Sequence, residues 1–399
     1  MAGITQFQSQ TKNVEYQKYK DIYELEDVDL KKNTIPKIIG TDYSYKHTWV
    51  WRNVIGFLIL HLLGLVGFFL VITGQTGFRT FLWTLLVAYL AAEGVTIGAH
   101  RFYTHKSFKA KPILRFILIL MQTMAGQNSM FVWARDHRLH HRYSDTDGDP
   151  HNSKRGFFFC HIGWLMKKKH PYVIELGRKI DMSDLQADWM VMYQKKYYYP
   201  LYLAVAILLP MLVPVYYFNE VWWKSLLVVY FFRYAFSLNG AWLVNSAAHI
   251  YGTRPYDKNL QPVESWFVSL ITFGEGWHNY HHTFPWDYKA AELSTHLNSS
   301  AFIIQLWEKL GLAYDLKTAS PEMVKNRIIR TGDGTHYLLG NDECRTAVTA
   351  LGPLHPLNPS YTTTQEAPDA ILKLEGLPLF HEKDFFNADS VLKRKVATA

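Results

Sequence analysis

Eighteen histidines occur in this chain of 399 residues, and half of them fall into four short groups. Neutral imidazole is the commonest protein ligand for metals, and it suits iron, zinc and copper. Nine such side chains are too many for one ion. The pattern therefore predicts two metal ions with four or five nitrogens each. The groups are His100 with His105; His137, His140 and His141; His249 alone; and His278, His281 and His282.

The spacing within these groups indicates how they converge. Side chains at i, i+3 and i+4 lie on one face of a helix, and both three-histidine groups have that spacing. Asn245 and His249 are stacked one turn apart. His100 and His105 are five residues apart, about 140° around a continuous α-helix. They converge only if the helix ends or bends there, which the end of a membrane span permits.

Four apolar stretches are long enough to position these groups at a membrane, since about 20 helical residues cross a bilayer core. They run over 54–73, 80–99, 199–217 and 221–244, and Pro210 and Pro214 sit late in the third. The connecting loops 74–79 and 218–220 are very short, which predicts two hairpins. The segment 101–198 carries 17 Lys or Arg, whereas the short loops hold only Arg79. The positive-inside rule then places both termini and this segment in the cytosol.

The rest of the chain divides into polar parts and one further apolar stretch. Residues 1–50 are polar and charged, and we expect them to form a cytosolic segment without a signal peptide. We expect a membrane domain over 51–334, with a cytosolic cap made of 101–198 and 249–334, and a disordered tail over 335–399. The stretch 112–133 contains Arg115, Gln122, Gln127 and Asn128, which favours an interfacial or re-entrant helix over a fifth span.

Composition fits this arrangement. The chain is 49% hydrophobic and 16% aromatic, and Trp and Tyr suit a membrane–water boundary. A mean hydropathy of −0.09 requires a large polar part outside the bilayer. The net charge of +8 suits anionic lipid or acidic partners; nucleic acid is unlikely, because the cations flank membrane spans. Two cysteines allow no disulfide framework, which fits a reducing compartment.

The histidines outside the four groups are expected to be structural, because a lone histidine in a membrane protein is more often packed or hydrogen-bonded than a ligand. They are His47, His61, His151, His161, His170, His296, His336, His355 and His381.

Around the clustered histidines the sequence resembles the membrane acyl-CoA desaturases of the stearoyl-CoA type, the insect members above all. The resemblance runs from about Trp51 to Gly334. It rests on G-A-H-R (98–101), W-A-R-D-H-R-L-H-H (133–141), D-P-H-N-S-K-R-G-F-F-F (149–159), W-L-V-N-S-A-A-H (242–249), G-E-G-W-H-N-Y-H-H (274–282) and R-T-G-D-G (330–334). It implies an all-α integral membrane protein of the endoplasmic reticulum, with four membrane helices in two hairpins under a cytosolic helical cap that holds a di-iron site.

The resemblance also implies an activity. The enzyme would use O2, and two electrons from NADH through cytochrome b5 reductase and cytochrome b5, to put a cis double bond into a long-chain saturated acyl-CoA. The expected position is Δ9 of a C16 or C18 chain; Δ11 or another position, a different chain length, or a related fatty-acid hydroxylase are the alternatives. The nine clustered histidines match the iron ligands, and Asn245 matches a residue that reaches the second iron through water. Tunnel positions match Gln127, Asn128, Trp133, Trp164 and Trp242, and positions near the CoA head group match Asn53, Arg135, Asp136, Lys168 and Lys169.

Three departures from the family pattern bear on specificity. The chain has H-R-F-Y-T-H where many relatives have H-R-L-W-x-H. Ala241 replaces a Thr that often precedes the tunnel Trp, so a hydrogen bond that shapes the tunnel's bend is expected to be missing. The stretch Q-P-V-E (261–264) resembles Δ9 types more than Δ11 types.

The chemistry of an unactivated methylene sets further requirements. Its C–H bond is too strong for acid–base catalysis, so redox-active ions are needed, and a d10 zinc ion cannot supply them. The ligand rings need partners that orient them, and Asp136, Glu275 and Asp287 are candidates by proximity in sequence.

A stripe of small residues suggests where the tunnel ends. Ala88, Ala92, Thr96 and His100 are spaced by four, and Ala92 lies about 12 Å along the helix from His100. We expect Ala92 and then Ala88 to floor the tunnel and set chain length. Ordinary small-residue helix packing is the alternative.

Two rival classes remain. A metal transporter would carry polar residues along several spans, where only Glu93 and Arg233 stand out. An inactive scaffold is disfavoured because all nine candidate ligands are present.

Overall fold

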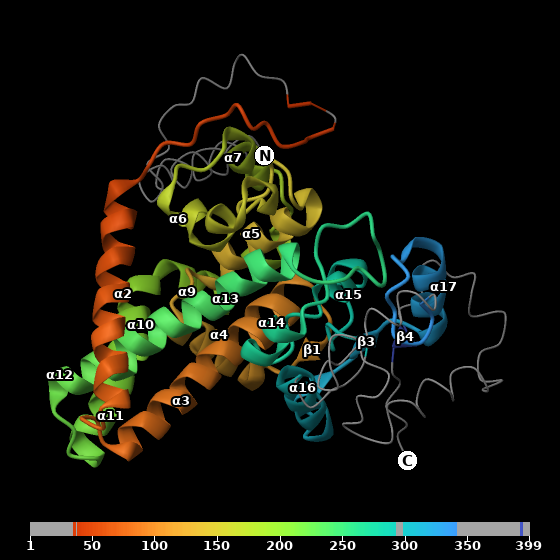
Figure 1. Ribbon diagram of the computed structural model, residues 1–399. Helices are drawn as coiled ribbons and strands as arrows, with labels where there is room; N and C mark the ends of the chain where they lie inside the picture. The colour runs from red at the N-terminus through yellow and green to blue at the C-terminus, as the bar shows by residue number, and fades with distance from the viewer. Residues whose placement is uncertain (1–34, 37, 293–297, 341–391, 394–399) are drawn as a thin grey trace, which may run out of the picture. The chain divides into compact units, whose positions relative to one another are not determined.

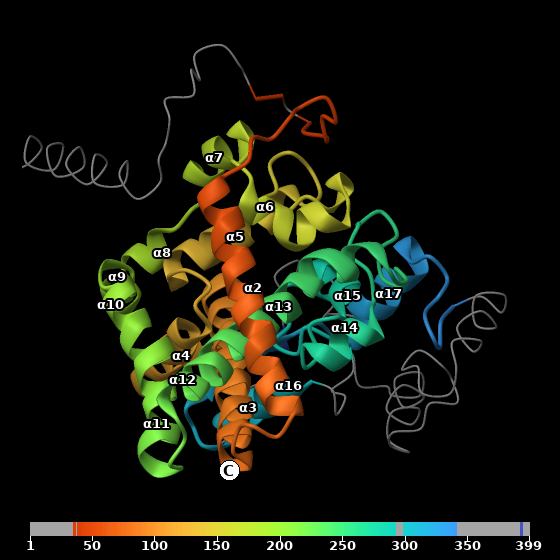
Figure 2. The same ribbon diagram turned by 60° about the vertical axis from the view of Figure 1, so that its left-hand side comes forward.

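A computed structural model describes residues 35, 36, 38–292, 298–340 and 392–393 (Figures 1 and 2). The elements below all belong to the compact unit that begins at Gly40. His296, His355 and His381 lie outside the described residues, as do the N-terminal segment up to residue 34 and most of the tail predicted to be disordered.

Among the described residues, four helices are long and apolar enough to cross a membrane, as predicted: Trp51–Ile72, Phe78–Thr104, Tyr198–Tyr217 and Trp222–Ile250. The second and fourth extend five or six residues past their predicted ends. His100 and His249 lie in these extensions, beyond the apolar stretches of the two helices that carry them.

The two short turns between the spans contact each other. The Gly77 N–H donates to Glu220 Oε2 at 2.9 Å, and Lys224 Nζ donates to the Gln75 carbonyl at 2.7 Å. Both turns therefore lie at one end of the bundle (Figure 1), as two parallel hairpins require.

Three of the four spans change from α-helix to the wider π-helix along their length. The first span, α2 (Trp51–Ile72), is a regular α-helix. The others combine segments: α3 (Phe78–Glu93) with η1 (Gly94–Thr104); α10 (Tyr198–Tyr202), η4 (Leu203–Leu208) and α11 (Leu209–Tyr217); and α12 (Trp222–Ser225), η5 (Leu226–Phe232) and α13 (Arg233–Ile250). In the third span the π segment ends just before Pro210, whose missing N–H cannot continue the bonding ladder.

The apolar stretch 112–133, for which the sequence favoured an interfacial or re-entrant helix over a fifth span, forms α4 (Pro112–Ala125). This helix is not a fifth span. Its 14 residues rise about 21 Å, short of a hydrocarbon core of about 30 Å. Gly126 ends the helix in the left-handed conformation, with φ of 70°. Ile113, Phe116 and Ile117 are exposed along one side of it, as expected of an interfacial helix.

The remaining elements are short. The helices are α5 (Met130–Tyr143), η2 (Ser153–Arg155), η3 (Phe159–Gly163), α6 (Trp164–Met166), α7 (Pro171–Arg178), α8 (Ser183–Gln186), α9 (Trp189–Lys196), α14 (Trp266–Ile271), α15 (His278–Thr283), α16 (Ser299–Lys309) and α17 (Pro321–Thr331). Two antiparallel strand pairs were not predicted: β1 (Lys109–Ala110) with β2 (Ala313–Tyr314), and β3 (Lys317–Thr318) with β4 (Leu392–Lys393).

The first residues of the tail predicted over 335–399 are folded. His336 is buried, and its Nε2 lies 2.9 Å from Glu292 Oε2. Residues 335–340 therefore belong to the folded unit.

Candidate metal centre

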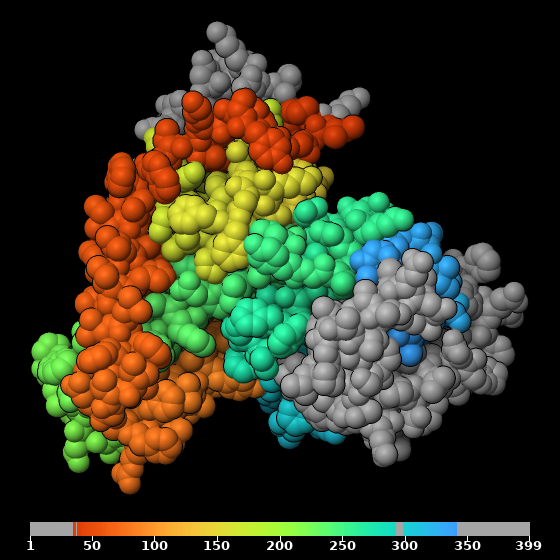
Figure 3. Space-filling model, viewed as in Figure 1, coloured from red at the N-terminus to blue at the C-terminus, as the bar shows by residue number. Residues whose placement is uncertain are grey.

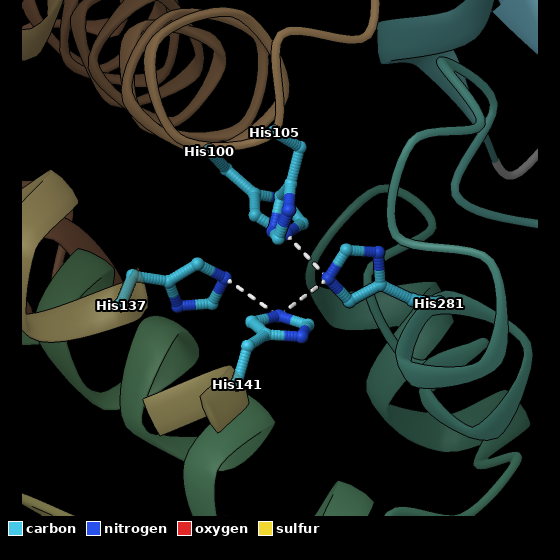
Figure 4. A group of neighbouring side chains, drawn as sticks. All are labelled: His100, His105, His137, His141 and His281. Carbon is cyan, nitrogen blue, oxygen red and sulfur yellow. Dashed lines mark hydrogen bonds between the residues drawn. The ribbon is translucent and has the colours of Figure 1, made fainter. Parts of the chain in front are cut away.

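The nine clustered histidines converge into two groups, in each of which one ring nitrogen from every histidine lies within 4.8 Å of the others. The groups are neighbours, since the rings of His141 and His282 stack across them with centroids 4.1 Å apart. The first group, shown in Figure 4, holds five histidines and the second holds four: His100, His105, His137, His141 and His281; and His140, His249, His278 and His282.

The π-helix η1 brings His100 and His105 together. The His105 N–H donates to the His100 carbonyl at 3.1 Å, which is an i→i+5 bond, and the two ring centroids lie 5.0 Å apart. In an α-helix these rings would diverge. The expectation that the helix must end or bend is half right: η1 ends at Thr104, but widening of the helix is what aligns the rings.

The helices α5 and α15 each contribute to both groups. The i, i+3, i+4 spacing places their rings on one face, as expected. That face meets both groups, so His137 and His141 enter the first while His140 enters the second. On α15, His281 enters the first while His278 and His282 enter the second. Two rigid helices therefore fix the separation of the two sites.

The donor set fits metal ions. Nε2 of His105 and Nε2 of His249 are buried without a hydrogen-bond partner. Others face one another directly: His281 Nε2 lies 2.8 Å from His100 Nε2 and 3.0 Å from His141 Nε2. Burial lowers the pKa of six of the rings well below the usual value, which leaves them neutral with lone pairs available. They are His105, His137, His141, His278, His281 and His282.

Three buried carboxylates orient histidines through the other ring nitrogen. Glu275 Oε2 lies 2.9 Å from His100 Nδ1. Asp149 and Asp145 hold Nδ1 of His140 and His249 at 2.8 and 3.1 Å. Such contacts turn Nε2 toward the site and fix the tautomer.

The charge of Glu275 is secured by its surroundings. Burial opposes the charged form, but Arg101 and His100 outweigh it and lower the pKa of Glu275 to about 2. The pKa values of Asp145 and Asp149 are also lowered despite burial, by His249 and His140 respectively. All three groups therefore remain ionised at neutral pH.

Of the three carboxylates that orient histidines, only Glu275 was among the three candidates predicted for this role. The other two candidates are wrong: Asp136 pairs with Arg135 and Lys169 at 2.6 and 2.8 Å, and Asp287 accepts from Tyr280 and Thr318 at 2.8 and 2.9 Å. Neither carboxylate contacts a ligand ring, because closeness in sequence does not fix the direction in which a side chain points.

The carboxylates that sequence reasoning missed lie in the turn after α5. The run D-T-D-G-D places three acids at alternate positions directly behind the histidines of α5. Asp145 and Asp149 orient histidines, while Asp147 pairs with Arg155. Three closely spaced acids beside a histidine motif were a signal in the sequence that could have identified them.

His151 was expected to be structural, yet it lies beside the second group. Its ring centroid is 4.3 Å from that of His140, and His140, Asp149 and His151 form a third set with metal-compatible spacing. By contrast, His61 and His47 lie outside all these sets and bind backbone carbonyls of Phe57 and Lys168. His161 binds Ser246 and Asn239, and His170 caps α7.

Asn245 lies on α13 one turn before His249 and is half-buried. Its contact with the second metal ion through water stays a prediction.

Two predicted tunnel residues meet beside the first group. The Trp133 indole N–H donates to Gln127 Oε1 at 3.1 Å, and the Trp133 ring stacks on His137 at 4.8 Å. Asn128 follows in the left-handed conformation, with φ of 68°, and is exposed.

The other two predicted tunnel residues lie elsewhere around the centre. Trp164 meets the His151 ring edge-on, with centroids 5.5 Å apart, and its buried indole N–H has no partner. Trp242 is buried and stacks on His61 of the first span at 6.2 Å.

Three of the residues predicted near a CoA head group form one charged cluster, in which Arg135 and Lys169 both hold Asp136. Asn53 instead donates to the Leu165 carbonyl at 2.7 Å. The backbone N–H of Lys168 donates to the carbonyl of Thr48 at 2.9 Å.

The small-residue stripe does not continue regularly to His100. The helix becomes a π-helix at Gly94, so the α-helical spacing by four ends there. Thr96 donates to Glu93 and bonds with Ser300 of α16. Ala88 and Ala92 are half-buried on α3, whereas Ala91 and Val95 are the buried residues that pack with Trp133.

Comparison with known proteins agrees with this geometry. A sequence model described as fatty acid desaturase matches residues 76–294. The chain is 50% identical over 297 residues to an acyl-CoA Delta-9 desaturase of Acheta domesticus, covering 74% of this chain and 82% of the relative. It is 50% identical to the stearoyl-CoA desaturase of Homo sapiens (73% and 81% covered) and 48% identical to an acyl-CoA Delta12-desaturase of Acheta domesticus (74% and 83% covered). The chain belongs to the fatty acid desaturase family.

Proposed function

We propose that this protein is an O2-dependent acyl-CoA desaturase that forms a cis double bond at the Δ9 position of a saturated C16 or C18 acyl-CoA. The observation that carries the proposal is the pair of adjacent histidine groups, five and four rings, with Trp133 stacked against the first. Relatives named as desaturases of acyl-CoA support the substrate class. One relative of similar identity is named for Δ12, so the bond position rests on weaker support.

Two iron ions held by the nine histidines, with Asn245 acting through water, would supply the redox chemistry that O2 requires to attack a methylene group. The protein's own part is positioning. Glu275, Asp145 and Asp149 hold three rings in place before substrate arrives. The rings are buried or partly buried, which would limit the access of water to the reacting carbons. Trp133 and Gln127 would hold the acyl chain beside the first group, which favours one bond and one geometry.

Membrane topology and partners complete the proposal. The meeting of both short turns at one end supports placing the other end, with both termini, in the cytosol at the endoplasmic reticulum. The net charge of +8 suits an acidic electron donor, for which we propose cytochrome b5 with its NADH-dependent reductase. The cluster of Arg135, Asp136 and Lys169 is the proposed contact for the CoA head group, together with Asn53 and Lys168.

A transport function is disfavoured by the contacts of Glu93 and Arg233, the two charged residues that stand out within the apolar stretches of the spans. Glu93 is buried and accepts from Ser299 and Ser300. Arg233 is buried and donates to the carbonyls of Val229, Met124 and Ala206. Both are satisfied by protein groups and line no path for an ion.

The test is expression in yeast that lacks its own Δ9 desaturase, with mass-spectrometric location of any new double bond. The expected result is growth without added unsaturated fatty acid and a Δ9 product from C16 or C18 chains. His140→Ala should abolish the product, while His47→Ala, outside the groups, should retain it. A hydroxylated product would assign a hydroxylase instead. Purified protein without iron, or normal product from His140→Ala, would refute the proposal.

A further inference from the structure

Two short helices outside the spans present large apolar side chains on their outer surface. On α16, Phe302, Leu306 and Leu310 are 68%, 44% and 64% exposed. Their spacing by four makes one stripe along the helix. On and after α14, the exposed apolar residues are Trp266, Phe267, Leu270 and Phe273. An apolar surface of this extent needs a covering partner.

The start of α16 and Phe273, two residues after α14, contact the second span within the length of a bilayer core from its start at Phe78. Ser299 and Ser300, in the first turn of α16, donate to Glu93 at 2.5 and 2.6 Å. Phe273 meets the ring of Tyr89 on the same span, with centroids 5.3 Å apart. Glu93 is the last residue of α3, which starts at Phe78, so it lies roughly 22 Å along the axis. That is less than the core thickness of about 30 Å.

Glu93 itself requires such a neighbour. A carboxylate at this depth is costly unless protein groups surround it. Its two oxygens accept from three hydroxyl groups, two of them on α16, and it is 1% exposed. The helix α16 therefore covers a polar group of the span from lipid, while its own apolar stripe is exposed. In the space-filling view (Figure 3), blue-green residues of this part of the chain lie at the molecular surface.

The surface also continues the outer face of the interfacial helix α4. The strands β1 and β2 join the start of α4 to the end of α16, and the Lys111 N–H donates to the Leu312 carbonyl at 2.9 Å. Leu114 and Leu118 of α4 share one core with Ala301 and Ile304 of α16. Exposed lysines at this junction, Lys111 and Lys309, suit the level of anionic head groups.

We propose that α14 and α16 are embedded in the bilayer leaflet next to the histidine sites, with their exposed apolar side chains in contact with lipid acyl chains. In the proposed topology this is the cytosolic leaflet. The exposed apolar side chains of α14 and α16, with Phe273 and Leu310 that follow them, then form a lipid-contact surface of their own, beyond the four spans and α4.

This surface is connected to the metal centre through buried contacts. Asn298 caps α16 and accepts from Arg101, whose guanidinium holds Glu275 at 2.7 Å. Glu275 in turn holds His100. The position of α16 against the membrane thus supports the ring orientation of a candidate ligand.

The test is the accessibility of spin labels to O2, which partitions into lipid, and to a water-soluble nickel chelate. Phe302→Cys and Leu306→Cys would each be labelled in a Cys344→Ser background, in phosphatidylcholine nanodiscs. Cys160 stays unlabelled because it is fully buried and burial raises its pKa to about 12. Leu85→Cys on the lipid side of α3 and Tyr43→Cys on the polar segment are the reference positions.

Both α16 labels should resemble the Leu85 label, with O2 contact several-fold above nickel contact. Labels that resemble the Tyr43 label would overturn the proposal, because the surface would then face water. Labels shielded from both reagents would also overturn it, since protein would then cover the surface. Spin–spin broadening that is lost on dilution with unlabelled protein would identify that protein as a second copy. Two labelled positions keep the test decisive if one variant does not fold.

Discussion

The His105 N–H and the His100 carbonyl are joined by a hydrogen bond of 3.1 Å that closes the last turn of an 11-residue π-helix. The bond belongs to the wider helix that brings the rings of His100 and His105 into the five-histidine group. An α-helix would have separated these two rings. The wider helix also packs unusually close to α4. A Cβ added at Gly94 would lie 2.3 Å from the Met121 backbone carbon, so the first turn of η1 depends on the absence of a side chain.

Gly94→Ala should therefore displace η1 and disrupt the first histidine group. Overpacking against backbone atoms typically costs about 1–3 kcal/mol or more, because neither helix can yield locally. We expect a lower melting temperature, and iron content and product formation below about half of wild type. Thermal unfolding in detergent and iron analysis of the purified protein measure this.

Gly98→Ala is the matched control, because its Cβ would lie 3.3 Å from the Leu118 Cβ, a much milder contact than the 2.3 Å at Gly94. It should stay close to wild type in stability and iron content. Equal damage from both substitutions would contradict the role given to Gly94.

Because different carboxylates hold ligands of the two histidine groups, we expect that metal binding at the two positions can be weakened separately. Asp145→Asn removes the charge behind His249 of the second group, and Glu275→Gln removes the charge behind His100 of the first. Loss of such partners typically weakens metal binding about 10–100-fold. Each variant should fall from two irons per chain toward one after dialysis against a weak chelator, and the double variant toward none. Two irons retained in both single variants would argue against this role.

The prediction that Ala92 sets the length of the acyl chain is tested by placing a larger side chain at this half-buried position. Ala92→Phe would fill space on α3 below the centre, and the expected result is a shift toward shorter acyl chains in expressing yeast. Leu86→Phe, on the exposed side of the same helix, should leave the chain-length profile unchanged. An unchanged profile for Ala92→Phe would favour ordinary helix packing at this position.

The head-group cluster predicts a change in substrate affinity. Lys169→Met removes one of two cations that hold Asp136, and these cations lower the pKa of Asp136 although burial opposes it. The KM for acyl-CoA should rise several-fold with little change in kcat, and the rise should shrink at high salt. Lys179→Met, at an exposed pair with Glu175, should leave both constants as they were. A fall in kcat alone would place Lys169 outside the binding site.

The fold was predictable where local patterns decide it. Four spans, their two hairpins and the interfacial α4 follow from apolar length and turn length. The histidine spacing on α5 and α15 fixes which rings share a face. The π-helix at Gly94 was not predictable, because no local propensity marks the residues that widen a helix. It arises from the packing of η1 on α4, a tertiary contact.

The orienting carboxylates show the same limit. Glu275 was found because it lies three residues before His278, yet it holds His100, from a different part of the chain. Asp145 holds His249, 104 residues away. Partners of this kind are set by where chain segments meet in space, and the sequence order that suggested Asp136 and Asp287 carries no information on that.

The stretch Q-P-V-E, noted in the sequence for its bearing on bond position, ends in a buried acid that predicts a pH dependence. Burial raises the pKa of Glu264 to about 8, and its Oε1 accepts from the Tyr280 N–H at 2.8 Å. Below pH 4.5, the ordinary value for Glu, the group is protonated in both folded and unfolded chains. As pH rises from there to about 8, the folded chain alone keeps the proton, so stability falls over this window.

Glu264→Gln should remove the loss of stability that the ionisation of Glu264 causes between pH 4.5 and about 8. Its melting temperature should fall less than that of wild type between pH 5 and pH 8, and should exceed it at pH 8, because no charge is then forced into the interior. Glu322→Gln on α17, a partly exposed residue, should follow wild type. Parallel curves for wild type and Glu264→Gln would mean that Glu264 is already ionised in the folded protein. A neutral Glu264 fits its position between α13 and α15, where the Val263 N–H donates to the Ala248 carbonyl directly before His249.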